Sequence, residues 1–129
     1  MTYLVGATLL VVGVIHLLPL VGVAGADRLS ALYGVTVAGP DLAILMRHRA
    51  VLFGLLGAFL VYAAFVPDSR SAAFVAGFVS VVSFLVLARA EGGYNAEVGR
   101  VVTVDLVALT CLVVGAAAHV YMLVRANAV

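Results

Sequence analysis

Residues 45–60 read LMRHRAVLFGLLGAFL and decide the fold class, because Arg47, His48 and Arg49 lead directly into a long apolar run. Of the 129 residues, 66% are hydrophobic and 10% are charged, whereas soluble domains average about 45–50% and about 25%. A chain this short cannot bury so much apolar surface in a soluble fold. We therefore expect membrane lipid to surround the protein. Its net charge of +1 argues against nucleic acid as a partner.

Four stretches are long enough for a membrane-spanning helix, which needs roughly 20 apolar residues. They form one predicted domain, residues 1–129, with spans at about residues 3–23, 42–66, 71–89 and 98–124. The sequence thus predicts an all-α fold, an integral membrane four-helix bundle with both termini on the same side. We name that side A and the opposite side B. Loop arginines are too evenly divided between the two sides to fix the orientation of the protein in the membrane. They slightly favour side B as the cytoplasmic side.

The connections on side B carry recognisable helix signals. Residues 27–33 can form one short interfacial helix that ends at Gly34. Asn95 can cap the fourth span, with Glu97 in its first turn. Both connections are expected to lie together at the same end of the bundle.

Helical spacing predicts which side chains of the second span face inward. Arg47 shares a face with Gly54 and Ala58, and small residues mark close helix–helix contacts in membranes. Arg49 shares the opposite face with bulky residues such as Leu56. We therefore expect Arg47 to point into the bundle, and Arg49 to point outward and contact lipid headgroups.

The same spacing places His16, Asp105 and His119 on inward faces. At a rise of about 1.5 Å per residue, His16, Arg47 and Asp105 fall at a similar depth near side B. His119 lies about 21 Å further along its helix than Asp105, at side A, where we expect a hydrogen-bonded packing residue or a headgroup contact.

Two interpretations of the His16, Arg47 and Asp105 cluster stay open, because charged groups inside a span are usually paired or functional. Arg47 and Asp105 can form a structural ion pair that fixes helix register. Alternatively, the cluster forms the polar floor of a cavity that opens toward side B and binds the head of an amphipathic molecule. The residues expected to roof such a cavity are Tyr33, Tyr94 and Asn95.

If the cavity is catalytic, which the sequence leaves undecided, His16 and Asp105 are the candidate catalytic residues. Imidazole has an ordinary pKa of about 6.5 and carries protons readily, and Asp105 would orient it or act as the base. Arg47 would hold an anionic or carbonyl oxygen. No metal site is predicted and the cofactor stays unknown, although His16 and His48 on neighbouring spans make bis-histidine haem ligation conceivable.

A family resemblance is carried by four motifs: IHLLPLVG (15–22), LYG (32–34), PDLAILMRHRAVLFGLLG (40–57) and GGYN (92–95). Together they resemble small bacterial four-span membrane proteins near the DoxX-like set, over nearly the whole chain. Many such sequences are labelled phosphopantetheine adenylyltransferase, but that soluble enzyme resembles an α/β nucleotidyltransferase with an HxGH motif, whereas His16 is followed by LLPL. The resemblance implies a multi-pass protein of the bacterial inner (cytoplasmic) membrane and transfers no catalytic residue.

The leading functional expectation is a small membrane protein that binds a hydrophobic or amphipathic small molecule (lipid, isoprenoid or quinone) at His16, Arg47 and Asp105. One alternative is a structural or accessory subunit whose glycine-rich faces pack against partner helices. Another is an oligomeric transporter or channel. The bundle is also expected to form a homo-oligomer.

Overall fold

The computed structural model describes residues 1–128, and it confirms the predicted all-α four-helix bundle. Val129, which the single predicted domain includes, lies outside the described residues. Within the described part, four helical segments are long and apolar enough to cross a membrane: Thr2–Ala24, Pro40–Phe65, Pro67–Glu91 and Ala96–Ala126. These segments indicate a multi-pass membrane protein.

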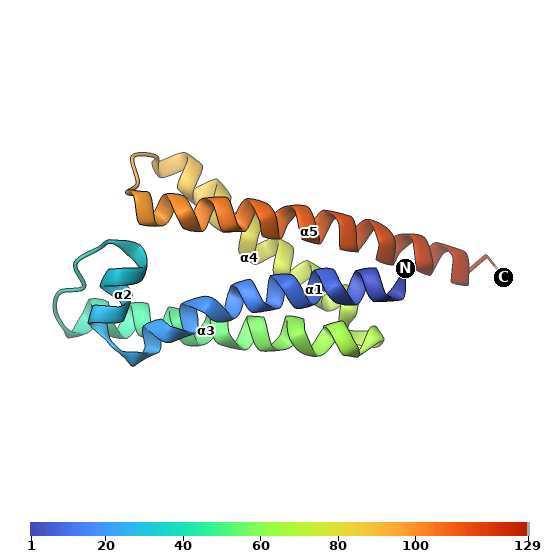
Figure 1. Ribbon diagram of the computed structural model, residues 1–129, viewed down its shortest axis with the longest axis horizontal. Helices are drawn as coiled ribbons and strands as arrows, with labels where there is room; N and C mark the ends of the chain where they lie inside the picture. Colours follow the sequence, from blue (N-terminus) through green and yellow to red (C-terminus); the bar gives the residue numbers. More distant parts are fainter. Residues whose placement is uncertain (129) are drawn as a thin grey trace.

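The first span combines helix α1 (Thr2–Leu17) with the 3₁₀ segment η1 (Leu18–Ala24). The short helix predicted in the first connection is α2 (Ala26–Tyr33), which lies at the side B end of the bundle (Figure 1). The remaining elements are α3 (Pro40–Phe65), the 3₁₀ turn η2 (Pro67–Ser69), α4 (Arg70–Glu91) and α5 (Ala96–Ala126).

The helix ends on side B follow the sequence signals. Gly34 ends α2 in the left-handed conformation at φ 63°, which glycine adopts without the steric cost that a Cβ imposes. Pro40 occupies the start of α3, where a missing backbone N–H costs nothing. The Asn95 side chain accepts a hydrogen bond from the backbone N–H of Val98 at 2.9 Å and so caps α5 as predicted.

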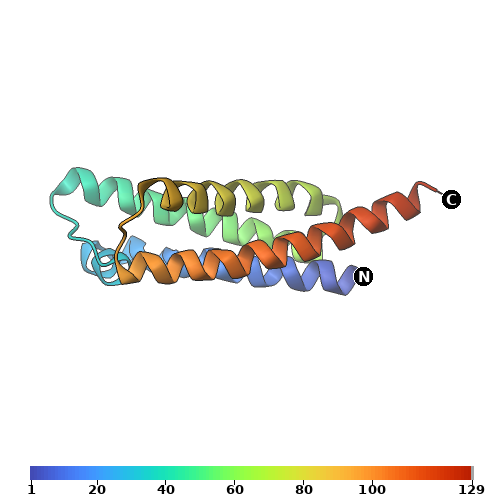
Figure 2. The ribbon, with the colours of Figure 1, turned by 90° about the horizontal axis from the view of Figure 1, so that it is seen from above.

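The four spans form a ring in the order α1, α3, α4, α5. Helix α1 packs most extensively against α3 and then against α5, and α4 packs against both α3 and α5. Both termini lie at the same end of the bundle, as Figures 1 and 2 show. This arrangement leaves α2 and the connection between α4 and α5 together at side B.

Helices α1 and α3 approach most closely where two glycines face each other. A Cβ on Gly57 would lie 2.8 Å from the carbonyl oxygen of Gly13, and a Cβ on Gly13 would lie 3.0 Å from that of Gly57. Gly54 is likewise filled from within the chain, by the side chain of Leu20. The glycine stripes predicted to support close packing therefore serve contacts inside the bundle.

The bundle centre is filled by large apolar side chains, and the outer surface is equally apolar. Leu9, Leu60 and Leu112 are fully buried between the helices. The outward face of α4 alone exposes four valines, Val75, Val79, Val82 and Val86. A hydrocarbon solvent accounts for both faces, because apolar groups are favourable there in the centre and on the surface.

Candidate functional site

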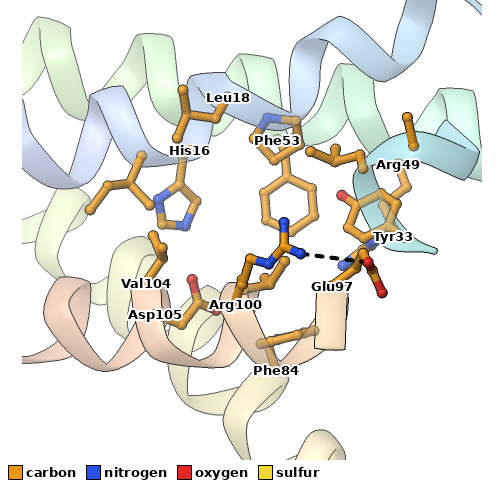
Figure 3. Close-up of a pocket in the computed structure, with 15 residues that line it drawn as sticks. His16, Leu18, Tyr33, Arg49, Phe53, Phe84, Glu97, Arg100, Val104 and Asp105 are labelled. Atoms are coloured by element: carbon orange, nitrogen blue, oxygen red, sulfur yellow. Dashed lines mark ion pairs between the residues drawn. The ribbon is translucent and has the colours of Figure 1, made fainter. Parts of the chain in front are cut away.

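A cavity with a volume of about 260 Å³ lies near side B between the first span, α2, α3, α4 and α5. Most of its wall is aliphatic or aromatic, and Phe53 and Phe84 contribute their rings (Figure 3). The polar and charged residues that line it are His16, Tyr33, Arg49, Glu97, Arg100 and Asp105. Ligand cavities typically combine such an apolar wall with a few polar groups.

Three of the predicted site residues, His16, Tyr33 and Asp105, line this cavity. In Figure 3, His16 and Asp105 lie toward one end of the cavity and Tyr33 toward the other, with the Phe53 ring between them. The predicted juxtaposition of helices α1 and α5 through His16 and Asp105 is therefore present in the structure. The other predicted residues lie elsewhere.

The predicted inward orientation of Arg47 is wrong. Its side chain is exposed and does not line the cavity. Its Nε donates a hydrogen bond to the backbone carbonyl of Val23 at 2.9 Å, near the end of η1, where helical carbonyls lack partners in their own helix. Arg47 thus ties α3 to the end of the first span and forms no ion pair with Asp105.

The predicted outward orientation of Arg49 is also wrong, because Arg49 lines the cavity. Its guanidinium carbon lies 5.2 Å from the ring centroid of Tyr33 and 4.8 Å from that of Phe53. Both distances suit cation–π attraction. Of the two neighbouring arginines of α3, Arg49 and not Arg47 is therefore the one that faces the cavity.

The reversal has a simple physical cause. Small residues mark the face of a helix that touches its nearest neighbour, which for α3 is α1, through Gly57 and Gly54. The bundle centre is wider and needs bulky side chains, so the face of α3 that carries Arg49 and Phe53 continues to the fully buried Leu60. Arg47 belongs to the edge that contacts α1.

His16 is almost completely buried and both of its ring nitrogens have partners. Nδ1 lies 2.9 Å from the carbonyl oxygen of Val12, and Nε2 lies 3.1 Å from the hydroxyl of Ser80. A carbonyl accepts only, so Nδ1 carries a proton and donates to it, and in the neutral ring Nε2 accepts from Ser80. His16 therefore presents its ring to the cavity and links α1 to α4.

Asp105 is half-buried on α5 and faces the cavity (Figure 3). Among residues 1–128, no side chain or backbone group donates a hydrogen bond to its carboxylate. The one ion pair in that part of the chain joins Arg100 and Glu97, whose atoms lie 3.6 Å apart. A carboxylate that faces an apolar cavity without a partner has hydrogen-bonding capacity left for a ligand.

The predicted roof residues Tyr94 and Asn95 do not line the cavity. Tyr94 is exposed. Asn95 contributes indirectly, because it contacts a lining residue and not the cavity. Its Nδ2 donates to the carbonyls of Tyr33 at 2.9 Å and Gly34 at 3.0 Å. It thereby joins the start of α5 to the end of α2 and holds Tyr33 over the cavity.

Several residues that line the cavity were not among the predicted site residues, although helical spacing points to some of them. On α5, Val101 lies one turn and Glu97 about two turns before Asp105, toward the same face, and Arg100 is three residues after Glu97. On α3, Phe53 is four residues after Arg49, the spacing at which helical side chains meet. Helical spacing counted from Arg49 and Asp105 would have joined Phe53 and Val101 to the site, and continuing it one turn before the fourth span would have reached Glu97.

The rim of the cavity mixes apolar and charged groups. Leu18 on η1 is 57% exposed and Val104 on α5 is 37% exposed, while the Arg100 side chain is 77% exposed. Figure 3 shows Leu18 and Val104 on opposite sides of His16. The exposed rim therefore carries apolar side chains from two different spans, which is suited to entry from the lipid.

The two remaining histidines lie apart from this cavity. His48 is exposed and does not line it with His16, so the chain itself does not place these two rings as a pair. At side A, Nε2 of His119 and the hydroxyl of Ser71 lie 2.9 Å apart, which agrees with the predicted hydrogen-bonded packing residue. In the described residues, no group of three or more His, Cys, Asp or Glu side chains could hold a metal ion.

Comparison with protein-family models, with curated proteins and with solved structures found no match. The resemblance to DoxX-like sequences therefore stays a prediction, and the functional argument depends on the geometry of the cavity.

Proposed function

We propose that this protein binds a hydrophobic or amphipathic small molecule in the cavity between its spans, with the polar groups of that molecule toward Asp105 and Arg49. The observation that carries the proposal is the pairing of an apolar wall with two charged groups that face the cavity and make no side-chain hydrogen bond within residues 1–128. The proposed location is the bacterial inner membrane, which the sequence resemblance favours.

The energetic cost of the two charges supports a ligand. A charged side chain within a span costs at least about 2.5–3.5 kcal/mol on insertion scales. Arg70 and Arg47 offset this cost by bonding to backbone carbonyls. Arg49 is held only by aromatic rings, and Asp105 makes no hydrogen bond among the described residues. A ligand whose polar groups bond to these side chains would offset the remaining cost.

The alternative functions have weaker support. The glycine faces that would have packed against partner helices are filled by residues of the same chain, such as Leu20 against Gly54. A transporter needs a polar route between the two sides, but Leu9, Leu60 and Leu112 fill the bundle centre. The homo-oligomer stays a prediction on which the cavity does not depend, because a single chain supplies all of its lining residues.

The test is mass spectrometry of small molecules that copurify with the protein after gentle extraction. Val101→Trp fills the cavity, and Val107→Trp places the same bulk on the exposed surface of the same helix. We expect wild type and Val107→Trp to retain one molecule in near-stoichiometric amount and Val101→Trp to lose at least nine-tenths of it. Equal retention by all three proteins, or retention by none, would refute the proposal.

A further inference from the structure

Helix α2 crosses the side B end of the cavity. It packs against η1, α3 and α5, and residues 31–33 at its end line the cavity. Leu29 is fully buried and packs against Gly22 of η1, whereas Asp27 and Arg28 are exposed. A helix with one apolar and one charged face lies at a boundary between apolar surroundings and water. Helix α2 thus turns its apolar face to the bundle and its charged face away from it.

The side chain of Asn95 holds the end of α2 in this position. The last carbonyls of a helix have no partner within it, and Asn95 Nδ2 donates to those of Tyr33 at 2.9 Å and Gly34 at 3.0 Å. Its Oδ1 accepts from the backbone N–H of Val98 at 2.9 Å. One amide group therefore caps both the end of α2 and the start of α5.

The contact between α2 and α5 leaves no room for a further side chain at Gly34. A Cβ there would lie 2.9 Å from Asn95 Nδ2 and 2.6 Å from Glu97 Oε2. From α3, the guanidinium carbon of Arg49 lies 5.2 Å from the ring centroid of Tyr33, which is only 7% exposed. Figure 3 shows Tyr33, Arg49 and Glu97 together at one end of the cavity. Side chains from α2, α3 and α5 therefore pack this end.

The apolar rim of the cavity lies at a different place. Leu18 is 57% exposed and Val104 is 37% exposed, and Figure 3 shows them on opposite sides of His16, away from Tyr33. Along α5, Val104 lies about 10 Å further from side B than Glu97, at a rise of about 1.5 Å per residue. This opening therefore faces the hydrocarbon of the membrane.

From these contacts we propose that α2 is a lid that separates the cavity from water at side B, with Asn95 as the side chain that holds it closed. The ligand then enters and leaves between Leu18 and Val104, through the lipid. This route avoids the transfer of apolar groups into water, which is unfavourable. The inference rests on the proposed function for the presence of a ligand and specifies how access to the site is controlled.

The experiment measures the access of two thiol reagents to the cavity. In the full-length protein with Cys111 replaced by alanine, Val101→Cys places a single thiol in the cavity. The protein is held in dodecyl maltoside micelles, so that both of its ends meet water. The anion 2-sulfonatoethyl methanethiosulfonate stays in the water, whereas uncharged N-ethylmaleimide also passes through the detergent. Intact-protein mass spectrometry gives the rate of each modification.

Asn95→Asp releases the lid and keeps the cap of α5, because aspartate accepts the bond from Val98 as well as asparagine does. Its carboxylate faces two carbonyl oxygens and lies near Glu97, so it cannot hold α2. We expect the sulfonate reagent to modify Val101→Cys at least tenfold faster in this variant, although the new charge repels it. The rate with N-ethylmaleimide should change less than twofold.

Asn95→Ser tests the lid without an added charge, because serine also caps α5 but has no amide group to donate to α2. It should accelerate the sulfonate reagent at least threefold. Asn127→Asp is the matched control, since it makes the same substitution at the exposed opposite end of α5. It should leave both rates unchanged, and circular dichroism should show equal helix content in all variants.

Two results would overturn the lid. One is an unchanged sulfonate rate in both Asn95 variants. The other is modification of Val101→Cys by the sulfonate, with Asn95 intact, as fast as that of Asp27→Cys, whose thiol lies on the exposed face of α2 outside the cavity. Equal acceleration of both reagents in Asn95→Asp would overturn the route through the lipid, since the uncharged reagent would then also depend on the lid.

The proposed function fails separately from this inference, because labelling needs no ligand. If no molecule copurifies but Asn95→Asp admits the sulfonate reagent, the lid stands and the proposed function is refuted. If a molecule copurifies and Val101→Trp removes it, while the sulfonate reagent enters freely with Asn95 intact, the binding site stands and the lid is refuted.

Discussion

The two ends of the bundle each contain an arginine and a histidine between spans, but they differ in whether the charged side chains have hydrogen-bond partners within residues 1–128. At side A, Arg70 is 5% exposed and donates to the carbonyls of Ala63 at 3.4 Å and Ala64 at 2.9 Å, and His119 bonds to Ser71. At side B, Arg49 and Asp105 face a cavity and make no such bonds within residues 1–128. An arginine in a span thus indicates a ligand site only where its donors are left unused.

The positions of the helix ends explain why the arginine at side A has hydrogen-bond partners. The last carbonyls of α3 have no partner within their own helix and lie at the negative end of its dipole. Arg70 begins α4 directly after the tight turn η2, so its guanidinium reaches those carbonyls. Arg47 likewise donates a hydrogen bond to the carbonyl of Val23 near the end of the first span. Both arginines are structural.

The largest expected effect follows from this difference. Arg70→Ala should lower the free energy of unfolding by about 2–3 kcal/mol, because it removes two charge-assisted hydrogen bonds to buried carbonyls. The measurement is unfolding by sodium dodecyl sulfate in mixed micelles, followed by far-ultraviolet circular dichroism. Arg49→Ala is the matched control and should lose only about 1 kcal/mol of cation–π attraction. Equal losses in the two variants would remove the distinction between the ends.

A smaller effect separates the two neighbouring arginines of α3. Arg47→Ala should lower the free energy of unfolding by about 1 kcal/mol, because it removes one hydrogen bond at an exposed site, and should leave ligand retention unchanged. Arg49→Ala should reduce retention of the copurified molecule at least fivefold in the same mass-spectrometric assay. Loss of the molecule in Arg47→Ala, with retention in Arg49→Ala, would restore the orientation that the sequence predicted.

Much of the fold could be predicted from the sequence, because a chain in a lipid bilayer must form apolar helices long enough to span it. Span length, the cap at Asn95 and the left-handed end at Gly34 are local properties, and each appears in the structure. Inward faces could also be recognised where a small-residue stripe and the bundle centre coincide, as for His16 and Asp105.

The site itself could be predicted only in part, since it depends on which neighbour each helix faces. Spacing alone cannot tell a face that touches the next helix from one that faces the centre, and Arg47 and Arg49 differ in this respect. Contacts between separate connections are equally inaccessible to spacing. The hydrogen bond from Asn95 to the carbonyl of Tyr33 joins two residues that are far apart in the chain. The side chain of Asn95 had been expected to roof the cavity instead.

The central claim is that side B contains an accessible cavity whereas side A is packed, and cysteine labelling tests it most directly. With the native Cys111 replaced by alanine, Val101→Cys places a thiol in the cavity and Ala118→Cys places one near His119, where Ala118 is 5% exposed. We predict that N-ethylmaleimide modifies Val101→Cys at least tenfold faster than Ala118→Cys. Equal rates at the two positions, or faster modification of Ala118→Cys, would contradict the account.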